Sequence, residues 1–461
     1  MSFGQRTLVS RRKALRYAAA VALGPVFKFT GGPAAAQTRP AGGVTYGSIN
    51  KYSAPSDLKI TDLRSATIAA NFDFPIIRMD TNQGVYGLGE VRDGGMAGSA
   101  LLLKPLLVGR SPLDITGILR ACRPHAGHGR LGGGYSAIDI CLHDLVGKVY
   151  GVPIWRLLGD KKRDRIRLYC DTTGTADPKL LAQRVLKRKQ AGFTFIKFDI
   201  TTNWVDKPGG LDSNRIMTEK GLAYAAELIT AAREALGPDV PIAVDGTGPG
   251  NVKDAIRYAK SFEKFNLAWV EDMLPWTNWR GYKQLRDATS TKVLTGEDIF
   301  GYEQGFQPLI ENDALDIVHP DPGTSGACRE TKRIADFAHM RGIMTALHMP
   351  GSPLGAMACS HVACTLDNLV AQEFHSQDFV DWWQKLVTRP ILEKGYITVS
   401  DSPGLGLELN EPVVREHLRY PGYFEPTPMY DQPITVRVGP RGPWPHYNVD
   451  GKWVNEATTD Y

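Results

Sequence analysis

The feature that most constrains this chain is a regular alternation of short apolar strands and amphipathic helices that begins at Ile166. Eight segments are predicted as strands: Ile166–Asp171, Phe195–Ile200, Ile242–Thr247, Ala268–Asp272, Lys292–Asp298, Leu315–Pro320, Met344–Met349 and Leu369–His375. Helices are predicted between them, for example over Pro178–Ala191, Glu219–Leu236 and Ala327–Arg341. Strands that alternate with helices form parallel sheets, and eight such units favour a closed barrel over an open sheet. The expected fold class is therefore α/β, with a modified, TIM-like (β/α) barrel.

A smaller region precedes the barrel. Residues 57–92 have the pattern of antiparallel strands, and residues 112–150 keep a helical spacing of apolar side chains. This predicts an α+β capping domain over 57–160, followed by the barrel over 161–390. Residues 391–461 are rich in Gly, Pro and Tyr. We expect them to return to the cap, complete it, and continue as an irregular surface tail.

The N-terminus resembles a twin-arginine export signal. Paired arginines precede a mild apolar stretch, Tyr17–Phe29, and the small residues of Pro33–Gln37 suit cleavage after Ala36. The apolar stretch is too short and too interrupted to span a membrane stably. We therefore expect 1–36 to be a signal peptide and 37–56 a linker, with a periplasmic or secreted mature protein that has no membrane anchor. The alternative is a disordered basic tail.

Composition narrows the class further. The content of 43% hydrophobic and 22% charged residues is ordinary for a soluble globular enzyme. A net charge of +5 over 461 residues, without a long basic run, does not suggest nucleic-acid binding. The six cysteines include no CxxC pair and no compact Cys/His cluster. We expect mostly buried thiols; a disulfide is possible but is not predicted.

Three acidic residues follow three successive predicted strands. Asp245 lies in AVDGTG, Glu271 in WVEDM and Glu297 in LTGEDIF. The active site of such a barrel is built at the carboxyl ends of its strands. Three carboxylates that converge there would repel one another unless a cation neutralised them. An all-oxygen ligand set suits Mg²⁺, with water and substrate oxygens completing its coordination. Each acid alone would more often be a helix cap or a surface ion pair.

Other strand ends carry acid–base groups. His348, after the seventh strand, pairs plausibly with Asp321, which would fix the imidazole tautomer and raise its basicity. Lys197 and Asp199 point to the same side of the second strand because side chains alternate. A buried Lys197 beside three carboxylates suits a substrate carboxylate or an enolic oxygen. Glu373 ends the eighth strand.

Taken in order on eight alternations after an α+β cap, the motifs KFD, VDG, VED, GED, PD and H resemble the enolase superfamily. The similarity is to its mandelate racemase/muconate lactonizing enzyme-type subgroup. AIDICLHDLVGKVYGVPIWRLLGD is similar to that family's linker helix, and Asp401–Glu411 to its C-terminal return segment. The resemblance covers Leu58–Pro412. It implies Mg²⁺-dependent removal of the proton next to a carboxylate, with the enolate stabilised by the metal.

The resemblance also assigns roles. It implies that Asp245, Glu271 and Glu297 bind Mg²⁺ and that His348, with Asp321, is the base on one face of the substrate. Relatives of this fold often form even-numbered oligomers, so a homo-oligomer is expected by analogy.

The second strand departs from the family pattern. Lys197 matches the first position of the family's KxK motif, which contacts the substrate carboxylate, but the second position is Asp199 instead of a lysine base. This weakens racemisation and favours syn dehydration of a sugar acid to a 2-keto-3-deoxy acid, in which His348 removes the proton and the same His could protonate the departing hydroxyl. Glu373 matches a position that hydrogen-bonds the substrate carboxylate when protonated, and a structural ion pair is the equal alternative.

Two further functions stay open. One is a racemase, epimerase or cycloisomerase that uses the same enolate, and the other is a non-catalytic, exported carboxylate-binding protein. Substrate specificity is expected from two cap loops, Ala69–Asp73 and Glu90–Gly98. Within them Asn71, Asp73 and Arg92 offer polar groups for sugar hydroxyls.

Overall fold

The computed structural model describes residues 57–70, 72–127, 132–246, 248–375 and 382–432, together with 446–447 and 453–454. The predicted signal peptide, the predicted linker and Asn71 lie outside the described residues. Within the described part of the chain, no helix has the length and apolar character needed to cross a membrane.

The parallel barrel has the eight predicted strands. They are β4 (Arg165–Thr172), β5 (Ile196–Asp199), β6 (Ile242–Asp245), β7 (Trp269–Glu271), β8 (Val293–Thr295), β9 (Ile317–Val318), β10 (Met344–Leu347) and β11 (Leu369–Phe374). Each strand pairs in parallel with the next, and β11 pairs with β4 to close the sheet. Several strands are shorter than predicted because their last predicted residues leave the ladder and enter the loops that carry the polar groups.

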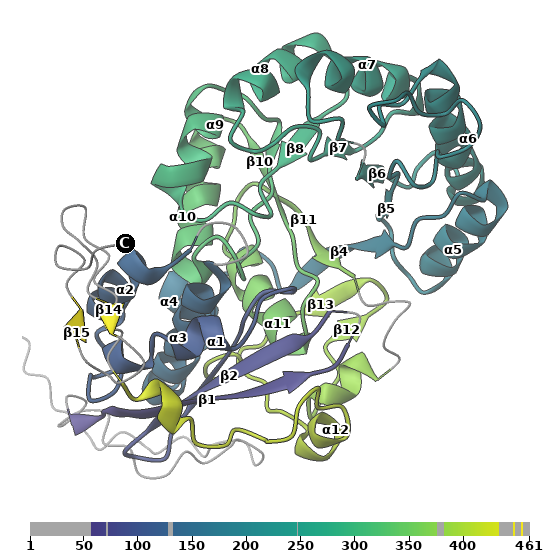
Figure 1. Cartoon of the computed structure of the whole chain (residues 1–461). Coiled ribbons are helices and arrows are strands. Elements are labelled where there is room, and N and C mark those ends of the chain that lie inside the picture. The colour runs from purple at the N-terminus through teal and green to yellow at the C-terminus, as the bar shows by residue number, and fades with distance from the viewer. Residues whose placement is uncertain are drawn as a thin grey trace, which may run out of the picture. The chain divides into compact units, whose positions relative to one another are not determined.

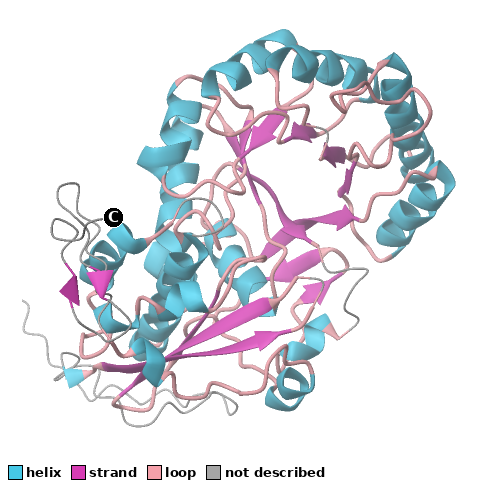
Figure 2. Ribbon diagram, viewed as in Figure 1, coloured by secondary structure: helices cyan, strands magenta, loops and turns pink. Residues whose placement is uncertain are grey.

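Helices cover the outside of the barrel, as Figures 1 and 2 show. They are α5 (Pro178–Gln190), α6 (Glu219–Leu236), α7 (Val252–Phe262), α8 (Trp279–Ala288), α9 (Gln307–Glu311), α10 (Ala327–Met340) and α11 (Pro353–Ala363). The bounds of α6 match the prediction. The Thr218 side chain accepts a hydrogen bond from the Gly221 N–H and caps its first turn, and Gly237, at φ 81°, ends it.

The inside of the barrel is filled by an apolar layer to which each strand or its entry contributes one residue. We call it the plug layer; it contains Tyr169, Phe195, Ala243, Trp269, Leu294, Ile317, Ala346 and Ala371. Its members are almost completely buried, and Trp269 packs edge-on against Tyr169 at a ring-centroid separation of 5.2 Å. The layer closes the bottom of the barrel. Polar side chains that also point into the barrel must therefore lie above this layer, nearer the carboxyl ends of the strands.

The cap combines a three-stranded antiparallel sheet with helices. The sheet contains β1 (Ile60–Ile68), β2 (Phe74–Thr81) and β3 (Gly87–Glu90) in that order, and the helices include α1 (Gly98–Leu101), α2 (Ile115–Cys122), α3 (Gly133–Tyr150) and α4 (Ile154–Leu158). Almost every residue of α3 is buried, and Gly151 in the left-handed region ends it. The Asp144 carboxylate of α3 accepts the Leu88 N–H of β3 at 2.8 Å.

The C-terminal segment contacts both the barrel and the cap. Two short strands, β12 (Leu392–Glu393) and β13 (Tyr396–Thr398), form a hairpin that pairs antiparallel with β4. Farther on, the Leu405 N–H donates to Asp144 at 2.8 Å, and the Arg419 N–H donates to the Thr67 carbonyl of β1 at 2.8 Å. The segment also contains a short helix, α12 (Glu411–Glu416), so it is more regular than the predicted tail.

The six cysteines are all buried and unpaired, which confirms the prediction of buried thiols. Burial raises the pKa of the Cys122 and Cys364 thiols to about 12. Such thiols are inert at neutral pH because the reactive form is the thiolate.

Candidate active site

A polar layer lies directly above the plug layer, and the alternation of side chains along each strand explains it. Counting two residues beyond each plug residue gives a polar residue on seven of the eight strands: Asp171, Lys197, Asp245, Glu271, His319, His348 and Glu373. On the remaining strand, Leu294 leads to Gly296 and then to Glu297. The site therefore follows from the same period of two that buries the plug.

Lys197 stands at the centre of this layer. Its ammonium nitrogen lies 3.3 Å from Asp245 Oδ2, 3.3 Å from Glu271 Oε1 and 2.8 Å from Glu373 Oε1. Burial opposes its charge, but these three carboxylates raise the pKa of Lys197 well above its ordinary value. The lysine is therefore a fixed positive charge in a largely anionic site.

The three predicted metal ligands border this space. Asp245 and Glu271 share the Lys197 ammonium, while Glu271 and Glu297 have ligand atoms within 4.8 Å of each other and of His319. Burial and the neighbouring Glu271 raise the pKa of Asp245 well above its usual range. This repulsion is what a cation among the carboxylates would relieve. An oxygen-only donor set of this kind fits a hard divalent ion such as Mg²⁺.

His348 and Asp321 form the expected dyad. His348 Nδ1 lies 2.6 Å from Asp321 Oδ2, and the other ring nitrogen, Nε2, lies 3.1 Å from Glu297 Oε2 and 3.4 Å from Glu373 Oε2. Although burial opposes it, Glu297, Glu373 and Asp321 together raise the pKa of His348 to about 10. Asp321 thus fixes the tautomer, and Nε2 faces the carboxylates.

Arg92 reaches the site from the cap and has a different role from the predicted one. Its guanidinium is fully buried and pairs with Asp93 at 2.8 Å, with Glu297 at 3.1 Å and with Asp298 at 3.0 Å. Because its donors are engaged by carboxylates, it supports the metal-ligand side of the barrel instead of presenting itself to sugar hydroxyls. Asp73, also predicted to bind hydroxyls, forms an ion pair with Arg419 at 2.7 Å.

Glu271 and Glu297 are each followed directly by a second acid, Asp272 and Asp298. Asp272 has a positive φ of 50° and accepts a hydrogen bond from the Thr295 hydroxyl at 2.6 Å, while Asp298 pairs with Arg92. His319 of the polar layer is completely buried, with Nε2 2.6 Å from the Tyr169 hydroxyl and Nδ1 3.1 Å from Glu271 Oε1. These contacts agree with a supporting role for Asp272 and Asp298.

Asp199 lies on β5, the strand of Lys197, and Glu373 lies on β11. Asp199 is half-buried at the end of β5, and burial together with Asp171 raises its pKa to about 7. Glu373 is buried; one oxygen pairs with Lys197, and the other accepts the Met349 N–H at 3.2 Å. The ion pair that was the alternative for Glu373 is therefore present.

Two groups that lie at the site had no role assigned to them from the sequence. One is Glu90 of β3, which accepts the N–H of Ser352 at 2.9 Å, the N–H of Gly355 at 3.1 Å and the Ser352 hydroxyl. These contacts tie the cap to the start of α11, next to the loop that holds His348. The other is the pair of His375 and Asp171, whose side chains meet at 2.6 Å. The only sequence signal for Glu90 is that an acidic residue directly precedes a glycine-rich loop.

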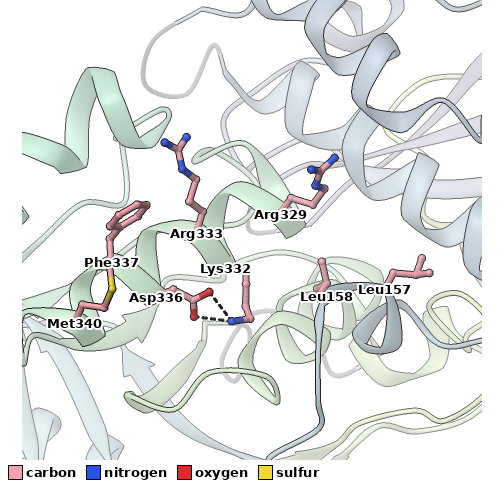
Figure 3. A pocket seen from close by; sticks show the side chains of 8 residues that line it. All are labelled: Leu157, Leu158, Arg329, Lys332, Arg333, Asp336, Phe337 and Met340. Atoms are coloured by element: carbon pink, nitrogen blue, oxygen red, sulfur yellow. Dashed lines mark hydrogen bonds and ion pairs between the residues drawn. The ribbon is translucent and has the colours of Figure 1, made fainter. Parts of the chain in front are cut away.

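A separate hollow on the outer side of the barrel is not this site. Figure 3 shows it between α4 and α10, with Phe337 and Leu157 on its wall and an ion pair between Lys332 and Asp336 at 2.5 Å. It contains none of the residues of the polar layer.

Family comparisons agree with this architecture. The description "Mandelate racemase / muconate lactonizing enzyme, N-terminal domain" matches residues 57–159, and "Enolase C-terminal domain-like" matches residues 180–413. A D-xylonate dehydratase of Haloferax volcanii is 33% identical over 395 residues, covering 83% of this chain and 91% of the relative. A D-galactonate dehydratase family member, RspA of Cellvibrio japonicus, is 27% identical over 387 residues, covering 78% and 95%.

Solved structures give the same result. A mandelate racemase/muconate lactonizing enzyme-like protein from Rubrobacter xylanophilus has a TM-score of 0.74 and 29% identity, covering 80% of this chain and all of that one. The 3,6-anhydro-D-galactonate cycloisomerase from Zobellia galactanivorans has a TM-score of 0.68 and 26% identity, covering 78% and 100%. Together with the barrel, the cap and the polar layer, these matches show that the chain belongs to the mandelate racemase/muconate lactonizing enzyme family of the enolase superfamily.

Proposed function

We propose that the protein dehydrates a sugar acid to a 2-keto-3-deoxy acid in a Mg²⁺-dependent reaction. The observation that carries this proposal is the His348–Asp321 dyad, whose Nε2 faces Glu297 and Glu373 in the same layer as Lys197. Relatives named as D-xylonate, D-galactonate-family and D-gluconate dehydratases support the choice of reaction and substrate class.

We assign Asp245, Glu271 and Glu297 to the metal. They fit Mg²⁺ because they are carboxylates that follow successive strands and their repulsion needs a counter-charge. Lys197 contacts Asp245 and Glu271, and Arg92 contacts Glu297, so all three are held in place. When bound, the ion supplies Lewis-acid stabilisation of the negative charge that develops on the substrate carboxylate. Neutralisation of Glu297 also lowers the pKa of His348, because Glu297 is the strongest of the charges that raise it.

The side chains of the site have separate roles in the reaction. His348 Nε2 accepts the proton from carbon 2, next to the carboxylate, while Asp321 stabilises the resulting imidazolium. Lys197 lies where a positive charge can stabilise the enolate oxygen that forms. Loss of the hydroxyl on carbon 3 and tautomerisation of the enol give the 2-keto-3-deoxy acid.

The structure and the relatives bear on the alternatives. A racemase needs a second acid–base group on the opposite face, and the residue there is Asp199, a carboxyl in an anionic environment. The similarity to the cycloisomerase from Zobellia galactanivorans makes cycloisomerisation through the same enolate the second candidate.

A screen of a sugar-acid library with Mg²⁺ tests the proposal. We expect release of water and formation of a keto acid from at least one member. In heavy water, exchange of the proton on carbon 2 with full retention of the hydroxyl would instead indicate an epimerase. Binding of sugar acids without any exchange would indicate a non-catalytic binding protein.

We also propose that the chain is exported and assembles as a homo-oligomer. The twin-arginine-like N-terminus supports export, and the family analogy supports assembly. N-terminal sequencing of protein from the periplasmic fraction should begin at Gln37, and replacement of both Arg11 and Arg12 by lysine should retain the precursor inside the cell. Light scattering of the mature protein should give an even number of subunits.

A further inference from the structure

A second His–Asp pair lies at the mouth of the barrel. His375 directly follows β11, and Asp171 lies on β4; the two become neighbours because Phe374 pairs with Cys170 where the barrel closes. His375 Nε2 lies 2.6 Å from Asp171 Oδ2. The His375 side chain is 22% exposed, whereas that of Asp171 is 7% exposed. A nearly buried carboxylate therefore orients an imidazole that reaches the mouth.

The order of strands places this pair within the proposed site. Around the barrel, β10 with His348 is followed by β11, then β4, then β5 with Lys197. Glu373 joins both sides, since it contacts Lys197 at 2.8 Å and His348 at 3.4 Å. His375 is two residues beyond Glu373, so it points to the same side of the strand and lies nearer the mouth.

The cap contributes one wall to this position. The ring of Phe72, which follows the first cap strand, packs edge-on against His375 at a centroid separation of 5.1 Å. The imidazole therefore lies between the polar layer and a cap side chain, on the mouth side of that layer.

Dehydration requires a proton donor that the dyad alone leaves unassigned. A hydroxyl group is a poor leaving group and must gain a proton as the C–O bond breaks. Among the described histidines at the barrel strand ends, the side chains of His375 and His348 are 22% and 7% exposed, while His319 is completely buried. His348 is already committed to the proton on carbon 2.

We propose that His375, oriented by Asp171, donates the proton to the departing hydroxyl group of the sugar acid. This inference rests on the proposed dehydration. His375 would be a catalytic residue and Asp171 a positioning residue.

In the proposed reaction, one imidazole removes a proton and the other donates one. His348 takes the proton from carbon 2, and the electron pair of that C–H bond is held in the enolate until it forms the double bond to carbon 3. The C–O bond at carbon 3 breaks, and the oxygen leaves as water with the proton from His375. The enol then loses its hydroxyl proton to His375 and gains a proton at carbon 3 from His348, which restores both imidazoles.

The charges around His375 favour its protonated form, as a proton donor requires. Burial opposes protonation, but Asp171 and then Glu373 raise the pKa of His375 to about 9, while the nearby Lys197 acts in the opposite sense. Asp199 is a further ionisable neighbour, because Asp171 and His375 both act on its pKa. An imidazole with this pKa is protonated at neutral pH.

The first test separates proton removal from loss of the hydroxyl. Wild-type protein, His375→Gln and the surface control His339→Gln are each incubated with Mg²⁺ in heavy water with D-xylonate, D-gluconate or D-galactonate. For His375→Gln we expect keto-acid formation to fall by about 10²–10⁴-fold while exchange at carbon 2 continues. His339→Gln, on the exposed face of α10, should behave as wild type.

The second test removes the need for a proton. A 3-deoxy-3-fluoro analogue of the best substrate loses fluoride, which departs with far less help from an acid. His375→Gln should therefore eliminate fluoride within about tenfold of the wild-type rate, since only the general-acid contribution is lost. An equal deficit with both substrates, or a deficit below tenfold with the hydroxyl substrate, would overturn the assignment of His375.

Asp171→Asn provides a second variant. Loss of the carboxylate should lower the pKa of His375, so the basic limb of the pH–rate profile should move to lower pH with the hydroxyl substrate and stay in place with the fluoro analogue. An unmoved basic limb would overturn the inference. Failure of the proposed function is distinguishable, because the wild-type protein would then form no keto acid from any of the three acids.

Discussion

At the scale of single residues, the site is organised by charge. Lys197 and Arg92 are buried cations at the site, and each contacts acids on more than one element. An unpaired buried charge is costly, so these cations fix the positions of the carboxylates before any substrate or metal arrives. The dyad of His348 and Asp321 depends on the same order, because Arg92 also lies 3.7 Å from Asp321.

The base assignment makes a direct prediction. His348→Asn should lower keto-acid formation by about 10²–10⁴-fold or more, because no other group accepts the proton on carbon 2. Exchange at carbon 2 in heavy water should disappear with it. Stabilisation by Mg²⁺ should persist, because His348 is not among the proposed ligands. Full activity in this variant would refute the assignment, and His339→Asn serves as the matched control.

At the scale of elements, the cap is held by contacts to both the barrel and the return segment. Glu90 of β3 binds the start of α11, where Ser352 is the cap residue of the helix. On the other side, Gly404 of the return segment lies against α3: its N–H donates to the Val152 carbonyl at 2.9 Å, and its carbonyl accepts the Ile154 N–H at 3.0 Å. Both contacts join segments that are far apart in the chain, so each can be tested by one substitution.

Glu90 should give the protein a pH-dependent stability. Burial, opposed by the hydrogen bonds to Ser352 and Gly355, raises the pKa of Glu90 from 4.5 to about 7. The folded state therefore holds a proton that the unfolded state has lost between these values, and the free energy of unfolding falls as pH rises through this window. The contribution is on the order of 3 kcal/mol across the window.

The measurement is urea unfolding of wild type and Glu90→Gln at pH 5 and pH 8. The neutral amide cannot titrate, so the loss of stability between the two pH values should be smaller in the variant by the contribution of Glu90. Equal losses in both proteins would contradict the prediction.

Gly404 should be intolerant of a side chain. Its φ is 68°, and a Cβ would lie 2.7 Å from the Asp144 carbonyl oxygen. We expect Gly404→Ala to lower the free energy of unfolding by about 3 kcal/mol, from backbone strain and the clash together. Gly109→Ala is the matched control, because φ is 83° there and nothing lies within 4 Å of the added methyl group. It should cost about 1 kcal/mol, and equal costs would show that the contact is irrelevant.

At the scale of the whole molecule, we expect the carboxylates at the barrel mouth to bind a cation. The carboxylates of β6, β7 and the loop after β8 face one space, and the family uses a metal there. A ligand that binds only the folded state stabilises it by about 2.7 kcal/mol at 100 times its dissociation constant.

The melting temperature should therefore rise with Mg²⁺ concentration after treatment with EDTA. Glu271→Gln should reduce this rise, while Asp287→Asn, which removes a surface acid paired with Lys283 at 2.5 Å, should leave it unchanged. A rise of equal size in both variants would show that the ion binds elsewhere.

The sequence by itself determined the architecture and much of the candidate site. A period of two along each strand and a helix between successive strands sufficed to predict the eight barrel strands. The same local rules placed Asp245, Glu271 and His348 at the carboxyl ends, because a strand's direction and its alternation are properties of neighbouring residues.

Only the tertiary structure decided which groups meet across the chain. His375 follows the last barrel strand and Asp171 lies on the first, so they touch only because the sheet closes. Arg92 and Glu90 enter from the cap, and nothing in their local sequence encodes the carboxylates or the helix that they contact. Local periodicity is fixed by backbone geometry. These pairs are instead fixed by the packing of elements that are distant in sequence, and the local sequence pattern does not specify which distant elements pack together.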